Sequence, residues 1–233
     1  MLLLFDIDGT LVRGRPLTHQ LALEQAATEV FGLRVEDGAT PVADVEPWGK
    51  TDRQILRDVL DRAGLPAPAE DALARWERIA CEAYMQLEAG MESSDELSAT
   101  AAALERMSAE GHALALVTGN LEPIARRKLA LRGLGDYFPA GQGGFGSDAE
   151  LRPELVPIAR TRAGEDGRPH PSEDTVLIGD TPLDVAAAAA DGVRCVAITG
   201  TRFSARDLRV AGAAATVDRI PEVEAALAEL AAP

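Results

Sequence analysis

The chain has 233 residues, a formal net charge of −15 and a hydrophobic content of 46%. A chain this apolar can form a core, whereas its negative charge opposes binding to nucleic acids and to anionic membranes. We therefore expect a folded protein with no nucleic-acid partner and no membrane partner. Any anionic ligand would need local positive charge or a metal ion to overcome the repulsion.

The two cysteines, Cys81 and Cys195, are too far apart in the sequence to indicate a disulfide framework. The apolar segment at residues 1–5 is too short for a signal peptide or a membrane span. Both features favour a reducing, cytoplasmic compartment. A monomer or a weak homodimer is the default expectation.

Short apolar runs alternate with helical patterns along most of the chain. Continuous apolar runs of this length are typical of strands buried on both faces, and alternation with helices predicts a parallel sheet covered on both sides. We therefore expect an α/β fold with a doubly wound, Rossmann-like core. The expected strands are residues 2–5, 113–117, 175–178 and 195–198, and the expected helices are 95–110, 121–133, 152–163, 182–191 and 221–231.

Residues 14–91 interrupt this alternation with three helical patterns and no strand. The first spans 18–31, the second begins at Thr51 with a capping-box pattern, and the third spans about 69–89. This predicts an inserted, all-helical cap domain at 14–91, and a core domain formed by 1–13 together with 92–233.

Polar clusters follow three of the expected strands, at Asp6–Thr10, Thr118–Asn120 and Gly179–Thr181. Ligands of such sheets bind beyond the carboxyl ends of the strands, so these clusters are expected to face one site.

Four acids belong to these clusters: Asp6, Asp8, Asp180 and Asp184. Acids gathered at strand ends repel one another unless a cation lies between them, and Mg²⁺ prefers such oxygen ligands. The alternative is local, because Asp-Gly is common in turns and residues 180–181 could cap a helix that begins at Pro182.

Thr118, Gly119 and Asn120 stand before an expected helix. A hydroxyl and backbone N–H groups near a helix start suit a phosphate, although the same residues could form an ordinary strand-to-helix turn with Asn120 as the cap.

These motifs resemble those of the haloacid dehalogenase superfamily, in order and across essentially the whole chain. The matching segments are Phe5-Asp6-Ile7-Asp8-Gly9-Thr10, Val117-Thr118-Gly119-Asn120 and Gly179-Asp180-Thr181-Pro182-Leu183-Asp184. The helical insertion is similar to the cap of the phosphoglycolate phosphatase and β-phosphoglucomutase branch.

The resemblance implies a phosphatase in which Asp6 is the nucleophile that becomes an aspartyl-phosphate and Asp8 is the general acid and base. It further implies that the Asp6 carboxylate, the Asp8 carbonyl and Asp180 hold Mg²⁺, supported by Asp184. Such chemistry is physically sensible, since a carboxylate attacks phosphorus well only when its charge is screened.

The family's usual lysine before the fourth motif is absent. Arg152 stands there, and we expect it to neutralise the nucleophile and the phosphoryl oxygens. Lys128 is the alternative, although its place in mid-helix suggests that it faces solvent. An arginine provides a fork of donors where a lysine provides a point charge, so the change is not conservative.

In the expected cap, Lys50 and Thr51 resemble the loop by which related caps reach their substrates, although both could simply belong to an exposed helix start. His19 lies near the hinge, where related mutases use a histidine, but a surface or hinge role is the simpler interpretation.

The sequence thus predicts a Mg²⁺-dependent phosphomonoester hydrolase for a small phosphorylated metabolite, similar to phosphoglycolate phosphatase. Alternatives are a β-phosphoglucomutase-like phosphotransferase, a phosphonatase that uses Lys50, and a non-catalytic interaction protein on the same fold. The presence of Asp8 counts against a dehalogenase, because dehalogenases lack an acid at this position.

Overall fold

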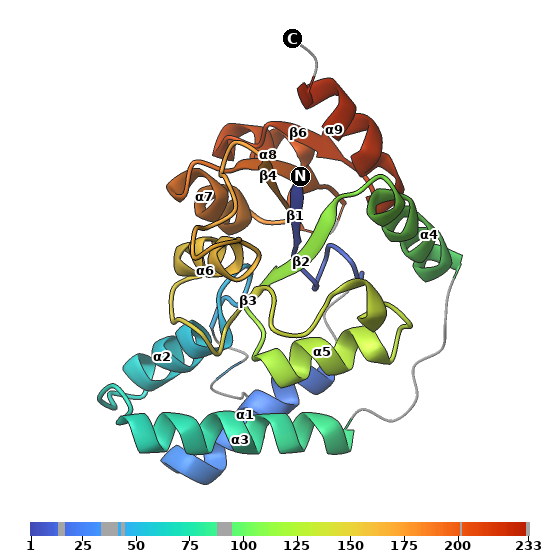
Figure 1. Cartoon of the computed structure of the whole chain (residues 1–233). Coiled ribbons are helices and arrows are strands. Elements are labelled where there is room, and N and C mark those ends of the chain that lie inside the picture. The colour runs from blue at the N-terminus through green and yellow to red at the C-terminus, as the bar shows by residue number, and fades with distance from the viewer. Residues whose placement is uncertain (14–16, 34–41, 43–44, 88–94, 201, 232–233) are drawn as a thin grey trace.

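A sheet of six parallel strands lies at the centre of the molecule (Figure 1). The computed structural model describes residues 1–13, 17–33, 42, 45–87, 95–200 and 202–231. In sequence order the strands are β1 (Leu2–Phe5), β2 (Ala113–Thr118), β3 (Gly144–Phe145), β4 (Thr175–Gly179), β5 (Arg194–Ile198) and β6 (Ala215–Val217). The four predicted strands are confirmed. The strands β3 and β6 were not predicted, because two or three residues are too few to form a recognisable apolar run.

The strands are ordered β3-β2-β1-β4-β5-β6, and every neighbouring pair is parallel. The chain runs outward from β1 to β3 in one direction and from β4 to β6 in the other. The neighbours β1 and β4 therefore lie where the winding reverses, which is the place where sheets of this kind form a crevice.

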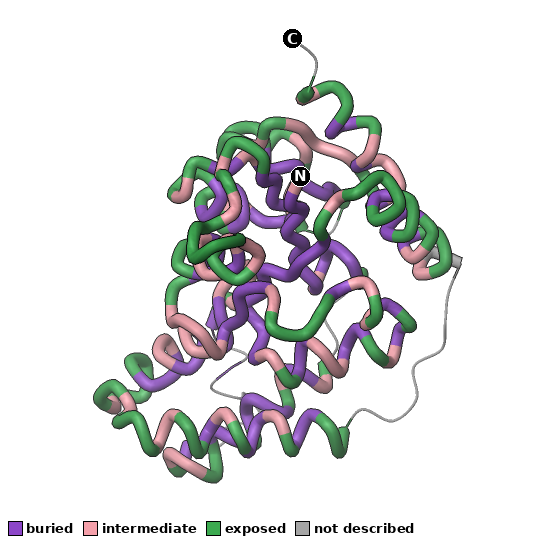
Figure 2. Tube along the Cα trace, viewed as in Figure 1, coloured by how far each residue is buried: buried purple, intermediate pink, exposed green. Residues whose placement is uncertain are grey.

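Helices cover both faces of the sheet, as the doubly wound prediction requires. Side chains of β1 alternate between the faces, so that Leu3 and Phe5 join one apolar cluster and Leu2 and Leu4 join the other. The first cluster includes residues of α4 (Asp95–Ala109), α5 (Glu122–Ala130) and α9 (Val223–Ala231); the second includes residues of α6 (Leu155–Arg162), α7 (Pro182–Ala190) and α8 (Ala205–Ala211). Figure 2 shows the strands as a buried centre inside helices with exposed outer faces.

Three short 3₁₀ helices complete the core at Gly135–Tyr137, Arg152–Glu154 and Ile220–Glu222. The second of them replaces the first turn of the helix predicted from residue 152, so α6 begins three residues later. None of the described helices is long and apolar enough to cross a membrane.

The insertion contains α1 (Leu17–Phe31), α2 (Asp52–Arg62) and α3 (Glu70–Leu87), which lie together at one end of the sheet (Figure 1). They share a separate apolar cluster that includes Leu23, Leu60 and Trp76 and also takes in Leu121 and Ile124 from the core side. We call α1, α2, α3 and the segment 45–51 the cap. The predicted boundary at 91/92 lies outside the described residues, and so does residue 14, so the domain limits stay a prediction.

Candidate active site

The crevice at the carboxyl ends of β1, β2 and β4 opens into a cavity of about 300 Å³. Its walls come from both the core and the cap. The core contributes Asp6, Asp8, Gly9, Arg13, Asn120, Arg152 and Asp180, and the cap contributes His19, Pro47, Trp48, Lys50, Asp52 and Ile55. The strand order therefore brings together the acids of two predicted motifs that are about 170 residues apart in the chain.

Three buried acids, Asp6, Asp180 and Asp184, form a cluster in which one oxygen of each lies within 4.8 Å of the others. Gly9 makes room for this cluster. Its φ is +88°, and a Cβ at this position would lie 2.1 Å from Oδ2 of Asp180. Only glycine allows the turn after β1 to approach Asp180 so closely.

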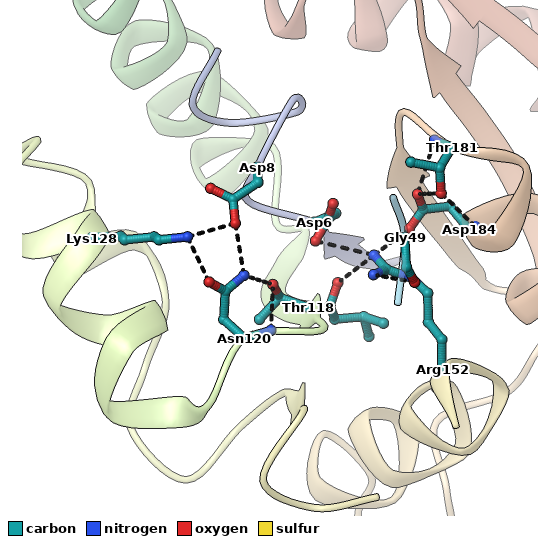
Figure 3. A network of polar contacts seen from close by, with 10 residues as sticks. Asp6, Asp8, Gly49, Thr118, Asn120, Lys128, Arg152, Thr181 and Asp184 are labelled. Carbon is teal, nitrogen blue, oxygen red and sulfur yellow. Dashed lines mark hydrogen bonds and ion pairs between the residues drawn. The ribbon is translucent and has the colours of Figure 1, made fainter. Parts of the chain in front are cut away.

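Arg152 is buried against two acids of this cluster (Figure 3). Its guanidinium lies 3.0 Å from Oδ1 of Asp6 and donates a hydrogen bond to Oδ1 of Asp184. It also donates to the backbone carbonyl of Gly49 in the cap, at 3.1 Å. Burial alone would lower the pKa of Arg152, but the charges of Asp184 and Asp6 raise it, so the guanidinium stays charged.

Asp184 is fully buried, and both of its oxygens are already engaged. Oδ1 accepts from Arg152, while Oδ2 accepts from the backbone N–H and the hydroxyl of Thr181, at 3.0 and 2.7 Å. Thr181 and Asp184 also form a capping box at the start of α7. The local capping interpretation therefore holds for Thr181, and Asp184 supports the cluster from behind.

Asp6 is short of positive charge in this arrangement. Burial raises the pKa of Asp6 to about 6; the Arg152 charge opposes this shift, whereas the Asp184 and Asp8 charges add to it. One guanidinium shared between two acids does not fully compensate them. Asp6 and Asp180 thus offer hard oxygen ligands where a cation would be stabilising, a donor set that fits Mg²⁺.

The side chain of Asp8 turns away from this cluster. Its Oδ2 accepts from the Lys128 ammonium at 2.6 Å and from the Asn120 amide at 2.9 Å (Figure 3). Burial alone would raise the pKa of Asp8, but the charge of Lys128 and the hydrogen bonds from Lys128 and Asn120 hold it well below its usual range. Its carboxylate is thus not a metal ligand in this arrangement, and the backbone carbonyl remains the candidate.

The expectation that Lys128 faces solvent is wrong. Its side chain is completely buried, and its ammonium contacts Asp8, Oδ1 of Asn120 at 2.6 Å and Nδ1 of His19 at 3.2 Å. The helical spacing contained the signal that was missed, because Lys128 lies four residues after Ile124 on the buried face of α5.

His19 is also buried, so the surface interpretation is wrong as well. Its Nε2 lies 3.1 Å from Oδ2 of Asp52, the first residue of α2. The same Asp52 oxygen accepts from the backbone N–H of Leu121 at 2.9 Å. Leu121 is the N-cap residue of α5, and its own side chain makes no capping hydrogen bond. The carboxylate of Asp52, from the cap domain, therefore binds this helix start, where Asn120 was expected to do so.

Thr118, Gly119 and Asn120 lie together at the end of β2. Gly119 and Asn120 line the cavity, whereas Thr118 is buried beneath them, and its hydroxyl accepts from the Asn120 amide at 2.7 Å. Gly119 touches the cap: a Cβ there would lie 2.2 Å from the carbonyl oxygen of Lys50.

The two predicted cap residues differ in their placement. Lys50 lines the cavity, but its ammonium pairs with Asp58 of α2 at 2.5 Å. Thr51 is buried beside the cavity as the N-cap of α2, where it accepts from the Gln54 N–H at 3.0 Å and donates to the Glu150 carbonyl. The helix-start interpretation thus accounts for Thr51.

Comparisons with known proteins agree with this arrangement. The family model described as haloacid dehalogenase-like hydrolase matches residues 3–189. A phosphoserine phosphatase of Thermus thermophilus is 28% identical over 225 residues, covering 84% of this chain and 87% of the relative. A plasmid-encoded phosphoglycolate phosphatase of Cupriavidus necator is 31% identical over 194 residues, covering 82% and 77%.

Among solved structures, a predicted phosphatase from Clostridium acetobutylicum matches with a TM-score of 0.69 at 19% identity and covers 98% of both chains. At this level of identity, the match shows that the fold is shared.

Proposed function

The chain belongs to the haloacid dehalogenase-like hydrolase family and is a phosphatase of that family, and on this premise we propose that it hydrolyses a small phosphate ester with Mg²⁺ through an aspartyl-phosphate. The proposal rests on the buried cluster of Asp6, Asp180 and Asp184, which contacts Arg152 at the carboxyl ends of the strands. A phosphoryl group bound there would face a carboxylate nucleophile and a fixed cation.

Arg152 and the end of β2 would bind the phosphoryl oxygens. The guanidinium supplies fixed positive charge, and the backbone N–H of Gly119 and the side chain of Asn120 would supply further donors. The buried Thr118 hydroxyl accepts from the Asn120 amide and would orient this end of β2 toward the phosphoryl group.

In the first step, an oxygen of Asp6 attacks phosphorus while the bond from phosphorus to the leaving oxygen breaks. Asp8 gives its proton to that oxygen, and Asp6 then carries the phosphoryl group. The lowered pKa of Asp8 describes the enzyme without substrate. A bound phosphate dianion beside Asp8 would add negative charge and so favour its protonated form.

In the second step, water attacks phosphorus, Asp8 accepts a proton from that water, and the bond between phosphorus and the Asp6 oxygen breaks. Free phosphate leaves and both carboxyl groups return to their initial states. Asp6, the Asp8 carbonyl and Asp180 would hold Mg²⁺, which supplies charge screening for the attack of one anion on another.

The cavity favours a small substrate, because the cap covers the crevice and leaves about 300 Å³. Three cations of the cap are already paired: Lys50 with Asp58, Arg53 with Glu77 and Arg57 with Glu150. The pairing of Lys50 counts against the phosphonatase alternative, since a Schiff base forms on a free, neutral amine. A phosphotransferase is the alternative that the assay must separate from a hydrolase.

A screen of small phosphate esters tests the proposal, beginning with p-nitrophenyl phosphate and phosphoglycolate. We expect release of inorganic phosphate with Mg²⁺ and none with excess EDTA. Conversion of β-glucose 1-phosphate to glucose 6-phosphate, without free phosphate, would instead establish phosphotransfer. Turnover that is indifferent to EDTA would contradict the role of the metal.

We also propose that the protein works in the cytoplasm on a freely diffusing small molecule. Cys81 and Cys195 are both free thiols, and burial raises the pKa of Cys81 to about 12, so its thiol is unreactive at neutral pH. Size-exclusion chromatography would decide between a monomer and a weak homodimer.

A further inference from the structure

A second cavity, of about 340 Å³, lies beside the segment that follows β1. Three parts of the core line it: Thr10 and Arg13 after β1, Thr100 of α4, and Arg219 and Ile220 after β6. Among the described residues, Arg13 alone lines both this cavity and the catalytic one. We call the second cavity the side pocket.

The charge of the side pocket differs from the charge of the chain as a whole. The chain has 38 acidic side chains against 23 lysines and arginines, and four acids line the catalytic cavity: Asp6, Asp8, Asp52 and Asp180. The described residues that line the side pocket include two arginines and no acid. A cavity lined by one sign of charge concentrates ions of the opposite sign, so this pocket favours an anion.

The two arginines are held in place by neighbouring groups. Arg13 donates from Nη2 to the backbone carbonyl of Asp218, which joins the segment after β1 to the segment after β6. Arg219 donates from Nε to Oε1 of Glu222 at 2.9 Å. A guanidinium has five N–H donors in a planar fork, so each arginine can keep this contact and also bind an oxyanion.

Thr10 gives a second, independent indication of a ligand. Only 5% of this residue is exposed, and its hydroxyl has no hydrogen-bond partner among the described residues. Burial of a hydroxyl without a partner is costly, and nearly all buried polar groups of folded proteins have one. An oxygen of an anion in the side pocket would provide the missing acceptor.

The remaining wall of the side pocket is apolar. It is formed by Leu11, Ala99, Ile220 and Pro221, of which Leu11 and Ile220 belong to the apolar cluster on one face of the sheet. An inorganic anion alone would leave this wall uncovered. The pocket therefore suits an organic anion with an apolar body.

We propose that the side pocket is a second ligand site, which binds a small organic molecule by a phosphoryl group. Arg13 and Arg219 bind its oxygens, the Thr10 hydroxyl donates to it, and the apolar body lies on Leu11 and Ile220. A phosphoryl group fits better than a carboxylate, because two guanidinium groups match its two negative charges. The inference goes beyond the proposed function, since no residue of the acidic cluster lines this pocket.

NMR spectra of the backbone amides test the proposal at constant ionic strength in EDTA. The probes are phenylphosphonate and methylphosphonate, which share a head group that the enzyme cannot hydrolyse and differ in their apolar body. We expect saturable shifts at the amides of Thr10, Thr100 and Ile220, and about 10-fold tighter binding of phenylphosphonate. Shifts confined to Gly119 and Asn120 of the catalytic cavity, or shifts that do not saturate, would overturn the proposal.

Benzoate tests the head group, because it has the same ring as phenylphosphonate with a carboxylate in place of the phosphonate. In mildly alkaline solution the phosphonate is a dianion and the carboxylate a monoanion. We expect benzoate to bind at least about 10-fold more weakly at the same amides. Equal or tighter binding of benzoate would contradict the assignment of a phosphoryl ligand.

Arg219→Ala and Arg78→Ala form a matched pair. Each arginine makes an ion pair with a nearby glutamate of its own segment, at 2.9 Å, and 65% and 59% of their side chains are exposed. Only Arg219 lines the side pocket. We expect Arg219→Ala to weaken phenylphosphonate binding by about 10-fold and Arg78→Ala to change it by less than about 2-fold. Equal effects of the two variants would overturn the site.

A second pair tests the buried hydroxyl. Thr10→Val removes the hydroxyl and keeps the branched shape, whereas Thr10→Ser keeps the hydroxyl. We expect Thr10→Val to weaken phenylphosphonate binding by about 5-fold and Thr10→Ser by less than about 2-fold. Identical affinities in the two variants would contradict the hydrogen bond. These measurements involve no turnover, so their outcome is independent of the proposed reaction.

Discussion

Asp6 and Asp8 are two residues apart, yet their surroundings shift their pKa values in opposite directions. Asp6 shares one guanidinium with Asp184, and burial raises its pKa to about 6. Asp8 has the Lys128 ammonium and the Asn120 amide on a single oxygen, and these hold its pKa well below the usual range. The number of cations per acid, and not burial alone, distinguishes the two carboxyl groups.

In the proposed reaction, the two acids have separate tasks. The site of Asp6 lacks positive charge and so has a place for a metal ion and a phosphoryl group. The carboxylate of Asp8 has a fixed orientation, and its lowered pKa keeps it charged until a bound substrate favours its protonated form.

Removal of the nucleophile should have the largest effect. We expect Asp6→Asn to lower turnover by about 10⁴-fold or more, because the amide cannot form the phosphorylated intermediate. Steady-state phosphate release measures the loss, and circular dichroism checks the fold. A variant that keeps a tenth of the wild-type rate would refute Asp6 as the nucleophile.

The second-largest effect should come from loss of Arg152, the cation that Asp6 and Asp184 share. Arg152→Met leaves Asp6 and Asp184 buried without their partner, which we expect to cost about 3–5 kcal/mol of unfolding free energy and about 10²–10³-fold in turnover. Urea denaturation and phosphate release measure the two effects. Arg152→Lys is the control; because one ammonium cannot replace the fork, we expect only partial recovery.

The raised pKa of Asp6 should appear in stability without metal. Between pH 4 and 6 the folded state binds a proton at Asp6 that the unfolded state has released, so stability falls as pH rises through this window. The shift to about 6 corresponds to a loss of about 3 kcal/mol. Urea denaturation in EDTA measures it.

Asp6→Asn provides the comparison for that pH experiment, because it keeps the shape and removes the titration. We expect the difference in unfolding free energy between wild type and variant to change across pH 4–6 in EDTA, and to change less with Mg²⁺ present. A constant difference in EDTA would show that Asp6 titrates normally.

A side chain added at Gly9, in the turn after β1, should have the smallest effect of these changes. A methyl group in Gly9→Ala would collide with Asp180, so we expect Mg²⁺ affinity to fall by about 10–100-fold. Gly64→Ala is the control for backbone strain, since Gly64 has a φ of +68° and no neighbour within 4 Å of an added Cβ. Its Mg²⁺ activation curve should match that of the wild type.

The strand ends were predictable because apolar runs that stop at acids are visible in sequence. The runs before Asp6 and Asp180 located two strands, and the parallel topology then placed the acids together. The expectation that Arg152 neighbours Asp6 agrees with their 3.0 Å separation, although its role in binding phosphate stays a proposal.

The contacts of the cap could not be predicted in the same way. Lys128, His19 and Asp52 come from three helices, and no local pattern says that their side chains meet. The place of Lys128 in mid-helix favoured a side chain that faces solvent. A buried charge needs a partner, and the partner of Lys128, Asp8, lies 120 residues away. Polar pairing between distant elements depends on the tertiary arrangement.

The contact between Gly119 and the carbonyl of Lys50 has a consequence for the access of solvent to the cavity. The end of β2 and the entry to α2 meet backbone to backbone, with no space for one further carbon atom. A methyl group at residue 119 would therefore push the cap away from the end of β2 and let solvent reach the crevice. The absence of a side chain at residue 119 thus lets the cap close tightly against the end of β2.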